Sequence, residues 1–191
     1  MALTNSTMLE IGTLAPAFSL PDTEDNTVSF EDVQGDKGAL VMFICNHCPY
    51  VKHVADELAR IGNEYPAKGI GVVAIQSNDI ENYPDDGPEK MKAEREQRGY
   101  KFPYLLDKDQ SVAKAYRAAC TPDFYVFDSE GKLAYRGQLD DSRPNDGKEV
   151  TGRDLRVAMD NVITGSSPQG DQKPSMGCNI KWIKGAEPAY F

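Results

Sequence analysis

Cys45 and Cys48, two cysteines separated by two residues, are the side chains in this sequence with the clearest capacity for chemistry. A thiolate is a nucleophile, and two thiols at this spacing can form and break a disulfide with each other. When one thiol attacks a substrate disulfide, the second can resolve the mixed disulfide that results. The pair therefore predicts dithiol–disulfide exchange, with Cys45 as the attacking thiol and Cys48 as the resolving thiol.

The residues around this pair predict that it lies where a strand leads into a helix. Residues 38–44 form a continuous apolar run, which indicates a strand buried on both faces, and apolar residues recur at helical spacing after Pro49. Free N–H groups and the macrodipole at the start of a helix stabilise a negative sulfur. We therefore expect a lowered pKa for Cys45 as the outer thiol and a more buried Cys48. His47, when protonated, is expected to tune the thiol pKa.

The other two cysteines, Cys120 and Cys178, are possible additional redox thiols. A cysteine such as Cys120 is ordinarily a small, buried apolar residue. Its position two residues before Pro122, however, brings it near the cysteine pair. Cys178 follows residues 165–174, whose Gly, Ser, Pro and Gln content predicts a flexible connection. Zinc would need two ligands beyond a single cysteine pair, so no metal is predicted, and no cofactor other than the redox-active disulfide.

The remaining segments predict an α/β layer fold with a central mixed sheet flanked by helices. An acidic loop follows Ile75 and emerges at the same sheet edge as Cys45, so Asn78 and Asp79 are candidates to touch a substrate, although a solvated loop is the simpler interpretation. The expected elements are an N-terminal β-hairpin extension over residues 14–20 and 27–30, strands over 70–75 and 102–106, helices over 88–98, 111–119 and 154–163, and a hairpin over 124–127 and 133–136.

Several motifs, in the right order over roughly residues 10–165, resemble the thioredoxin superfamily. Gly12-x-x-Ala15-Pro16-x-Phe18-x-Leu20 and Phe127-Asp128-x-x-Gly131-Lys132 resemble its alkyl-hydroperoxide-reductase (AhpC/TSA) or redoxin branch, and the tail Gly177–Trp182 resembles a bacterial peroxiredoxin-like subgroup with a C-x-x-C site. The resemblance implies a thioredoxin-like fold and a cis peptide bond between Thr121 and Pro122, facing the cysteines. It also implies that these two residues form the substrate groove, with the Thr121 backbone open to an extended peptide.

Two functions use the same cysteines and stay open. A peroxiredoxin site has a threonine three residues before its peroxidatic cysteine, but that position is Cys45 when counted from Cys48 and Met42 when counted from Cys45. A thiol-disulfide oxidoreductase acting on protein or small-molecule disulfides with an external reductant is therefore the first hypothesis. A thiol-dependent peroxidase, an antioxidant that reduces peroxides, is the alternative. A non-enzymatic redox-sensing or metal-binding module is the second alternative.

Composition excludes other classes of protein. The chain of 191 residues carries a formal charge of −9, which argues against nucleic acid or anionic lipid as a partner. Residues 1–12 lack the basic start and apolar run of a secretory signal, and no segment is apolar enough to span a membrane. We expect a cytoplasmic protein with a thioredoxin-like domain over residues 1–165 and a C-terminal extension over residues 166–191, packed on or near that domain.

Overall fold

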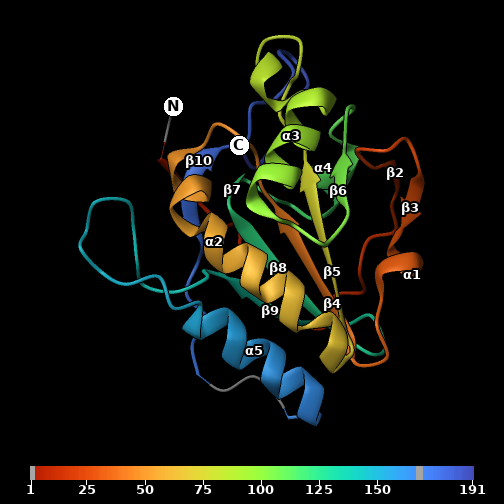
Figure 1. Ribbon diagram of the computed structural model, residues 1–191, viewed down its shortest axis with the longest axis vertical. Helices are drawn as coiled ribbons and strands as arrows, with labels where there is room; N and C mark the ends of the chain where they lie inside the picture. Colours follow the sequence, from red (N-terminus) through yellow and green to blue (C-terminus); the bar gives the residue numbers. More distant parts are fainter. Residues whose placement is uncertain (1–2, 167–169) are drawn as a thin grey trace.

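The central sheet of the protein is mixed, as the sequence predicts. In the computed structural model, which describes residues 3–166 and 170–191, five strands lie in the order β6-β5-β4-β8-β9 (Figure 1). Strand β4 is parallel to β5 and antiparallel to β8, and all six of its residues are buried. The strands are β4 (Gly38–Phe43), β5 (Ile70–Gln76), β6 (Tyr104–Leu106), β8 (Asp123–Asp128) and β9 (Leu133–Gly137).

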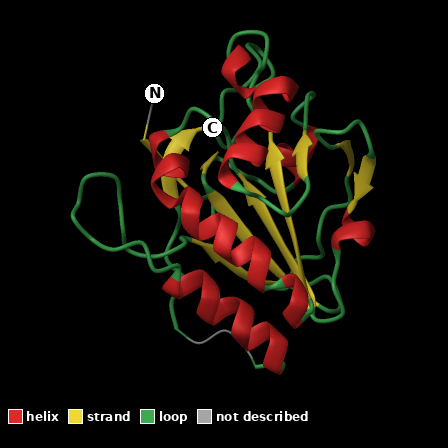
Figure 2. Ribbon diagram, viewed as in Figure 1, coloured by secondary structure: helices red, strands yellow, loops and turns green. Residues whose placement is uncertain are grey.

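Helices cover both faces of this sheet, which explains why β4 has no alternation of polar and apolar residues (Figure 2). One face packs against α2 (Pro49–Glu64), α3 (Pro88–Arg98) and α5 (Arg153–Thr164). The other face packs against α1 (Phe30–Val33), α4 (Ser111–Ala115) and residues of the C-terminal segment, including Trp182. Two short 3-10 turns, η1 (Pro66–Lys68) and η2 (Pro84–Asp86), follow α2 and β5. No helix in the described part of the chain is both long and apolar enough to cross a bilayer.

Most predicted elements are present, with two corrections. The N-terminal hairpin consists of β2 (Ser19–Pro21) and β3 (Thr27–Ser29), but Phe30 begins a helix because the Ser29 hydroxyl accepts a hydrogen bond from the Asp32 N–H. The helix predicted over residues 111–119 ends at Ala115. Arg117 has a φ of 53°, which a right-handed helix cannot contain, and the chain turns there into β7 (Cys120–Thr121).

A second, three-stranded sheet was not expected. Strand β10 (Met176–Asn179) lies between β1 (Leu3–Asn5) and β7, antiparallel to both, and so joins the two ends of the chain beside the cysteine pair (Figure 1). Of the connection predicted to be flexible, residues 167–169 lie outside the described residues. Its later part is anchored, because the Gln172 side chain accepts a hydrogen bond from the Arg136 N–H and Lys173 forms an ion pair with Asp141.

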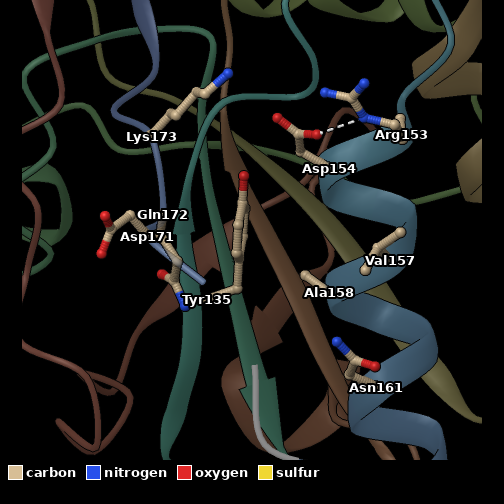
Figure 3. Close-up of a pocket in the computed structure, with 9 residues that line it drawn as sticks. All are labelled: Tyr135, Arg153, Asp154, Val157, Ala158, Asn161, Asp171, Gln172 and Lys173. Atoms are coloured by element: carbon tan, nitrogen blue, oxygen red, sulfur yellow. Dashed lines mark hydrogen bonds and ion pairs between the residues drawn. The ribbon is translucent and has the colours of Figure 1, made fainter. Parts of the chain in front are cut away.

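A hollow of about 280 Å³ lies between α5 and the segment that precedes β10 (Figure 3). Its lining residues are Tyr135, Arg153, Asp154, Val157, Ala158, Asn161, Asp171, Gln172 and Lys173. Because these include no cysteine, the hollow is separate from the candidate redox site.

Candidate active site

The cysteine pair lies at the strand-to-helix junction, as predicted. Cys45 lies two residues beyond the end of β4, and Cys48 is the N-cap residue of α2, whose first residue is Pro49. A proline is well suited to this first position, because its missing N–H would have no partner inside the helix. Cys45 is 2% exposed and Cys48 is 0% exposed. The expected contrast between an outer and a buried thiol is therefore absent.

Thr121 contacts both sulfurs from the opposite side. The peptide bond between Thr121 and Pro122 is cis, which confirms the prediction. The Thr121 Oγ1 lies 3.4 Å from the Cys45 Sγ, and the Thr121 carbonyl accepts a hydrogen bond of 3.2 Å from the Cys48 Sγ. A hydroxyl group therefore lies beside Cys45. It comes from Thr121, since residue 42, three positions before Cys45, is a methionine.

The open backbone edge expected at Thr121 is occupied. Strand β10 pairs antiparallel with β7, and Cys178 is the register partner of Thr121. The neighbouring Gly177 allows this approach, because a Cβ atom there would lie 2.0 Å from the Thr121 carbonyl oxygen. The prediction that Thr121 offers its backbone to an extended peptide is therefore wrong for this conformation, since the chain's own C-terminal segment has taken that place.

The thiol pKa values run opposite to the prediction. The hydrogen bond with Cys45 lowers the pKa of Cys48 to about 5 despite burial, and interactions with Cys178 and the Val51 N–H act in the same direction. The hydrogen bond with Cys48, together with burial and the negative charge of Asp86, raises the pKa of Cys45 well above its usual value. The expected lowering at Cys45 is wrong because, of the two interacting thiols, Cys48 is the one whose pKa falls and Cys45 the one whose pKa rises.

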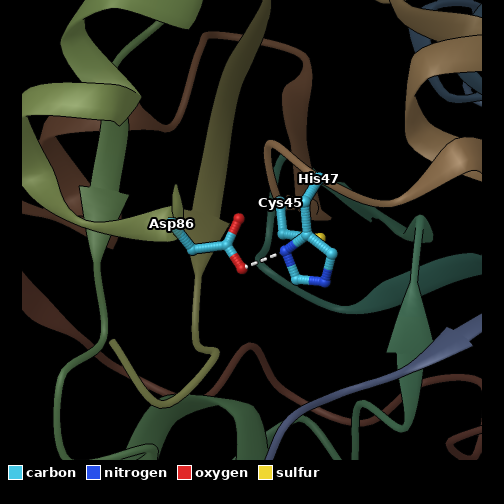
Figure 4. A group of neighbouring side chains, drawn as sticks. All are labelled: Cys45, His47 and Asp86. Atoms are coloured by element: carbon cyan, nitrogen blue, oxygen red, sulfur yellow. Dashed lines mark ion pairs between the residues drawn. The ribbon is translucent and has the colours of Figure 1, made fainter. Parts of the chain in front are cut away.

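His47 forms an ion pair with a buried carboxylate. The His47 Nδ1 lies 2.6 Å from the Asp86 Oδ2 (Figure 4). The imidazole ring stacks on Tyr83. Asp86 is fully buried and also accepts hydrogen bonds from the Asn46 N–H and the Asn78 side chain. Burial opposes its ionisation, but the hydrogen bonds, that of His47 foremost, lower the pKa of Asp86. Because the Asp86 charge acts against a Cys45 thiolate, it offsets the help expected from His47.

The loop after β5 is buried only at its start and at Asp86, whereas residues 81–85 are exposed, as expected of a solvated loop. Asn78 and Asp79 are both buried, and they bind the C-terminal segment instead of an open substrate site. The Lys181 N–H donates to the Asn78 Oδ1, and the Asp79 N–H donates to the Lys181 carbonyl, each at 2.8 Å. The sequence predicted the correct edge of the sheet for this loop, but the partner of Asn78, Lys181, is 103 residues further along the chain.

Cys120 and Cys178 differ in their relation to the pair. Cys120 is fully buried, its Sγ lies 3.7 Å from the Pro122 carbonyl oxygen, and burial raises its pKa well above the usual value. Cys178 packs in the same apolar cluster as Cys45 and Cys48. Burial, followed by the interaction with Cys48, raises the pKa of Cys178 to about 12.

Three side chains have donor atoms close enough to hold a metal ion together. Single ligand atoms of Cys45, His47 and Asp86 all lie within 4.8 Å of one another. Sulfur, imidazole nitrogen and carboxylate oxygen are each ligands of Zn²⁺, and three protein ligands with one open position are typical of catalytic rather than structural zinc. This set of ligands could not be predicted from the spacing of residues, because Asp86 is 39 residues from His47 in the chain.

Comparison with known proteins identifies the family. Residues 11–136 match the model of the AhpC/TSA family. A Mycobacterium tuberculosis (strain CDC 1551 / Oshkosh) protein named "Putative peroxiredoxin MT2597" is 30% identical over 144 residues, which cover 69% of this chain and 86% of that protein. Thiol-disulfide oxidoreductase ResA from Bacillus thuringiensis (strain Al Hakam) is 26% identical over 65% of this chain and 68% of its own.

A solved structure extends the similarity to almost the whole chain. The crystal structure of an uncharacterized conserved protein from Geobacillus kaustophilus is 54% identical, with a TM-score of 0.95, and the match covers 97% of this chain and 99% of that one. The chain belongs to the AhpC/TSA family within the thioredoxin superfamily. Its relatives, thiol-disulfide oxidoreductases and peroxiredoxin-like proteins, make it an oxidoreductase.

Proposed function

We propose that this protein is a thiol-disulfide oxidoreductase in which Cys45 and Cys48 pass between dithiol and disulfide. The observation that carries the proposal is the position of the two thiols at the start of α2, where Thr121 contacts both sulfurs; the interaction between the thiols also lowers the pKa of Cys48 to about 5. Such a pair holds one negative charge at neutral pH, so a reactive sulfur is present without an added base. The four cysteines are all free, which fits the reducing cytoplasm that we propose as its location.

The catalytic cycle moves two electrons from the protein to the substrate. As the Cys45 sulfur attacks a substrate disulfide, its proton passes to the Cys48 thiolate, and the first substrate thiolate leaves. Cys48 then gives up that proton to the departing thiolate and attacks the Cys45 sulfur, which releases the second substrate sulfur and forms the Cys45–Cys48 disulfide. An external thiol reductant must restore the dithiol. We take protein or small-molecule disulfides as the substrates.

A trapping experiment with glutathione disulfide tests this assignment. Reduced Cys48→Ser protein is expected to accumulate a glutathione adduct on Cys45, identified by peptide mass spectrometry, while the wild type proceeds to the Cys45–Cys48 disulfide. Cys120→Ser is the matched control, because Cys120 is equally buried but its sulfur contacts the Pro122 carbonyl instead of the pair. An adduct on another cysteine, or none on Cys45, would overturn the assignment.

A thiol-dependent peroxidase is the second candidate, and one contact favours it. The Thr121 hydroxyl lies 3.4 Å from the Cys45 Sγ, where it can donate a hydrogen bond to a bound peroxide. We rank this function second because residue 42, three positions before Cys45, is a methionine instead of the threonine of a peroxiredoxin site. A stopped-flow comparison of hydrogen peroxide with glutathione disulfide separates the two functions.

A further inference from the structure

Cys178 lies where an external substrate was expected. In the paired sheet, β10 occupies the backbone edge of β7, and Cys178 is opposite Thr121, the residue that contacts both Cys45 and Cys48. Cys178 packs in the same buried cluster as Cys45 and Cys48, where β10 contacts α2. The C-terminal strand therefore presents a cysteine to the pair in the manner of a bound substrate.

This placement is fixed from both sides of the strand. Before Cys178, the Ser175 hydroxyl donates to the Pro122 carbonyl at 2.6 Å. After it, the Ile180 N–H donates to the Ala119 carbonyl at 3.0 Å, and the Lys181 N–H donates to the Asn78 side chain at 2.8 Å. These bonds hold the backbone of β10 against β7 on both sides of Cys178, in the buried cluster that contains Cys48.

We propose that Cys178 is a second resolving thiol, which converts the Cys45–Cys48 disulfide into a Cys48–Cys178 disulfide and so frees Cys45. This inference rests on the proposed function, because it requires the first disulfide to form. The Cys178 sulfur attacks the Cys48 sulfur, the Cys45–Cys48 bond breaks, and Cys45 leaves with the electron pair and takes the proton that Cys178 gives up. The exchange is an isomerisation, so it needs no further oxidant or reductant.

The exchange separates the attacking sulfur from the stored disulfide. Cys45 becomes a free thiol again beside the Thr121 hydroxyl, while the oxidised state is held between α2 and β10. Reduction can then begin at Cys178, and attack there releases Cys48 as the leaving thiol. Cys120 lacks this relation, because its sulfur contacts the Pro122 carbonyl.

Disulfide mapping of the oxidised protein tests the proposal. Wild-type protein is oxidised with glutathione disulfide, quenched in acid, labelled with N-ethylmaleimide and mapped by mass spectrometry without reduction. Both the Cys45–Cys48 and the Cys48–Cys178 disulfides are expected, the second accompanied by labelled Cys45. In Cys178→Ser, this labelling of Cys45 in oxidised protein is expected to be lost, whereas Cys120→Ser keeps it.

A second variant separates this inference from the proposed function. Cys45→Ser cannot attack a substrate, but the general thiol oxidant diamide is expected to join its Cys48 and Cys178. If oxidised wild type contains only the Cys45–Cys48 disulfide and Cys45→Ser forms none, the role of Cys178 is refuted and the proposed function stands. If the wild type forms no Cys45–Cys48 disulfide while Cys45→Ser is cross-linked, the proposed function fails and the contact between Cys48 and Cys178 is supported.

Discussion

Replacing Asp86 by asparagine removes the buried negative charge nearest to the Cys45 sulfur. The ligand atoms of the two residues lie within 4.8 Å of each other. At that separation two unit charges repel by roughly 3–4 kcal/mol at an effective dielectric constant of about 20, which is equivalent to roughly 2–3 pKa units. Protonated His47 cancels part of this repulsion, so we expect the pKa of Cys45 to fall by about 1–2 units in Asp86→Asn.

The measurement needs Cys45 to titrate alone. In a Cys48→Ser background the proton shared between the two thiols is gone, and thiolate absorbance at 240 nm can be followed against pH with and without Asp86→Asn. The matched control is Asp85→Asn. Asp85 is the exposed acidic residue immediately before Asp86, and its backbone carbonyl, not its carboxylate, accepts a hydrogen bond from Asn46. The control is expected to leave the Cys45 titration unchanged.

The same change has a cost in stability. Asp86 accepts hydrogen bonds from Asn46 and Asn78 in addition to its ion pair with His47, and an asparagine oxygen can replace only part of this set. We expect the free energy of unfolding to fall by about 1–3 kcal/mol, so circular dichroism must first show that the variant is folded. A folded variant whose Cys45 pKa stays the same or rises would refute the reasoning.

Three further predictions follow from buried polar groups and from the choice of substrate. Burial raises the pKa of Asp123 to about 7, although hydrogen bonds from Ser6 and Tyr125 act in the opposite direction. Since an aspartate in the unfolded chain ionises near pH 4, the free energy of unfolding measured in urea should fall by roughly 4 kcal/mol as the pH rises from about 4 to 7, with no further fall above it. Asp123→Asn should remove this dependence on pH, and a variant that keeps the wild-type dependence would contradict the prediction. Thr121→Val should slow the reaction with hydrogen peroxide by about tenfold or more and the reaction with glutathione disulfide by less, because it removes the hydroxyl beside Cys45; equal losses in stopped-flow traces would count against a role in peroxide binding. Reduced wild-type protein should react faster with glutathione disulfide than with hydrogen peroxide, and the opposite order would favour the peroxidase.

The sequence predicted those parts of the fold whose signals are local. Strand β4 and helix α2 were predicted because a strand covered on both faces is apolar throughout, and a helix covered on one face is apolar at every third or fourth residue. The position of Cys45 and Cys48 followed from these two elements. Thr121 was found only through the family resemblance, since β7 is two residues long.

The rest of the site depends on contacts between distant segments. Nothing in the sequence connects Asp86 with His47, because a buried ion pair leaves no periodic pattern. Strand β10 has the sequence Met-Gly-Cys-Asn, which lacks the alternation and the β-branched residues that indicate a strand. The pKa order of Cys45 and Cys48 depends first on the interaction between the two thiols and on burial, and then on Asp86 and Cys178, which η2 and β10 bring to the pair; the sequence shows neither of these distant partners.

The position of β10 between β1 and β7 bears on how a shortened form of this chain would behave. A protein ending at residue 165 would lose β10 and leave β7 and β1 with unpaired N–H and carbonyl groups. Such open edges bind other strands, including those of a second copy, so aggregation or dimerisation through the region next to Pro122 is the expected result. Affinity tags and fusion partners attached near Phe191 are expected to have a weaker effect of the same kind. They follow β10 in the chain, and β10 pairs with β7 beside the cysteine pair.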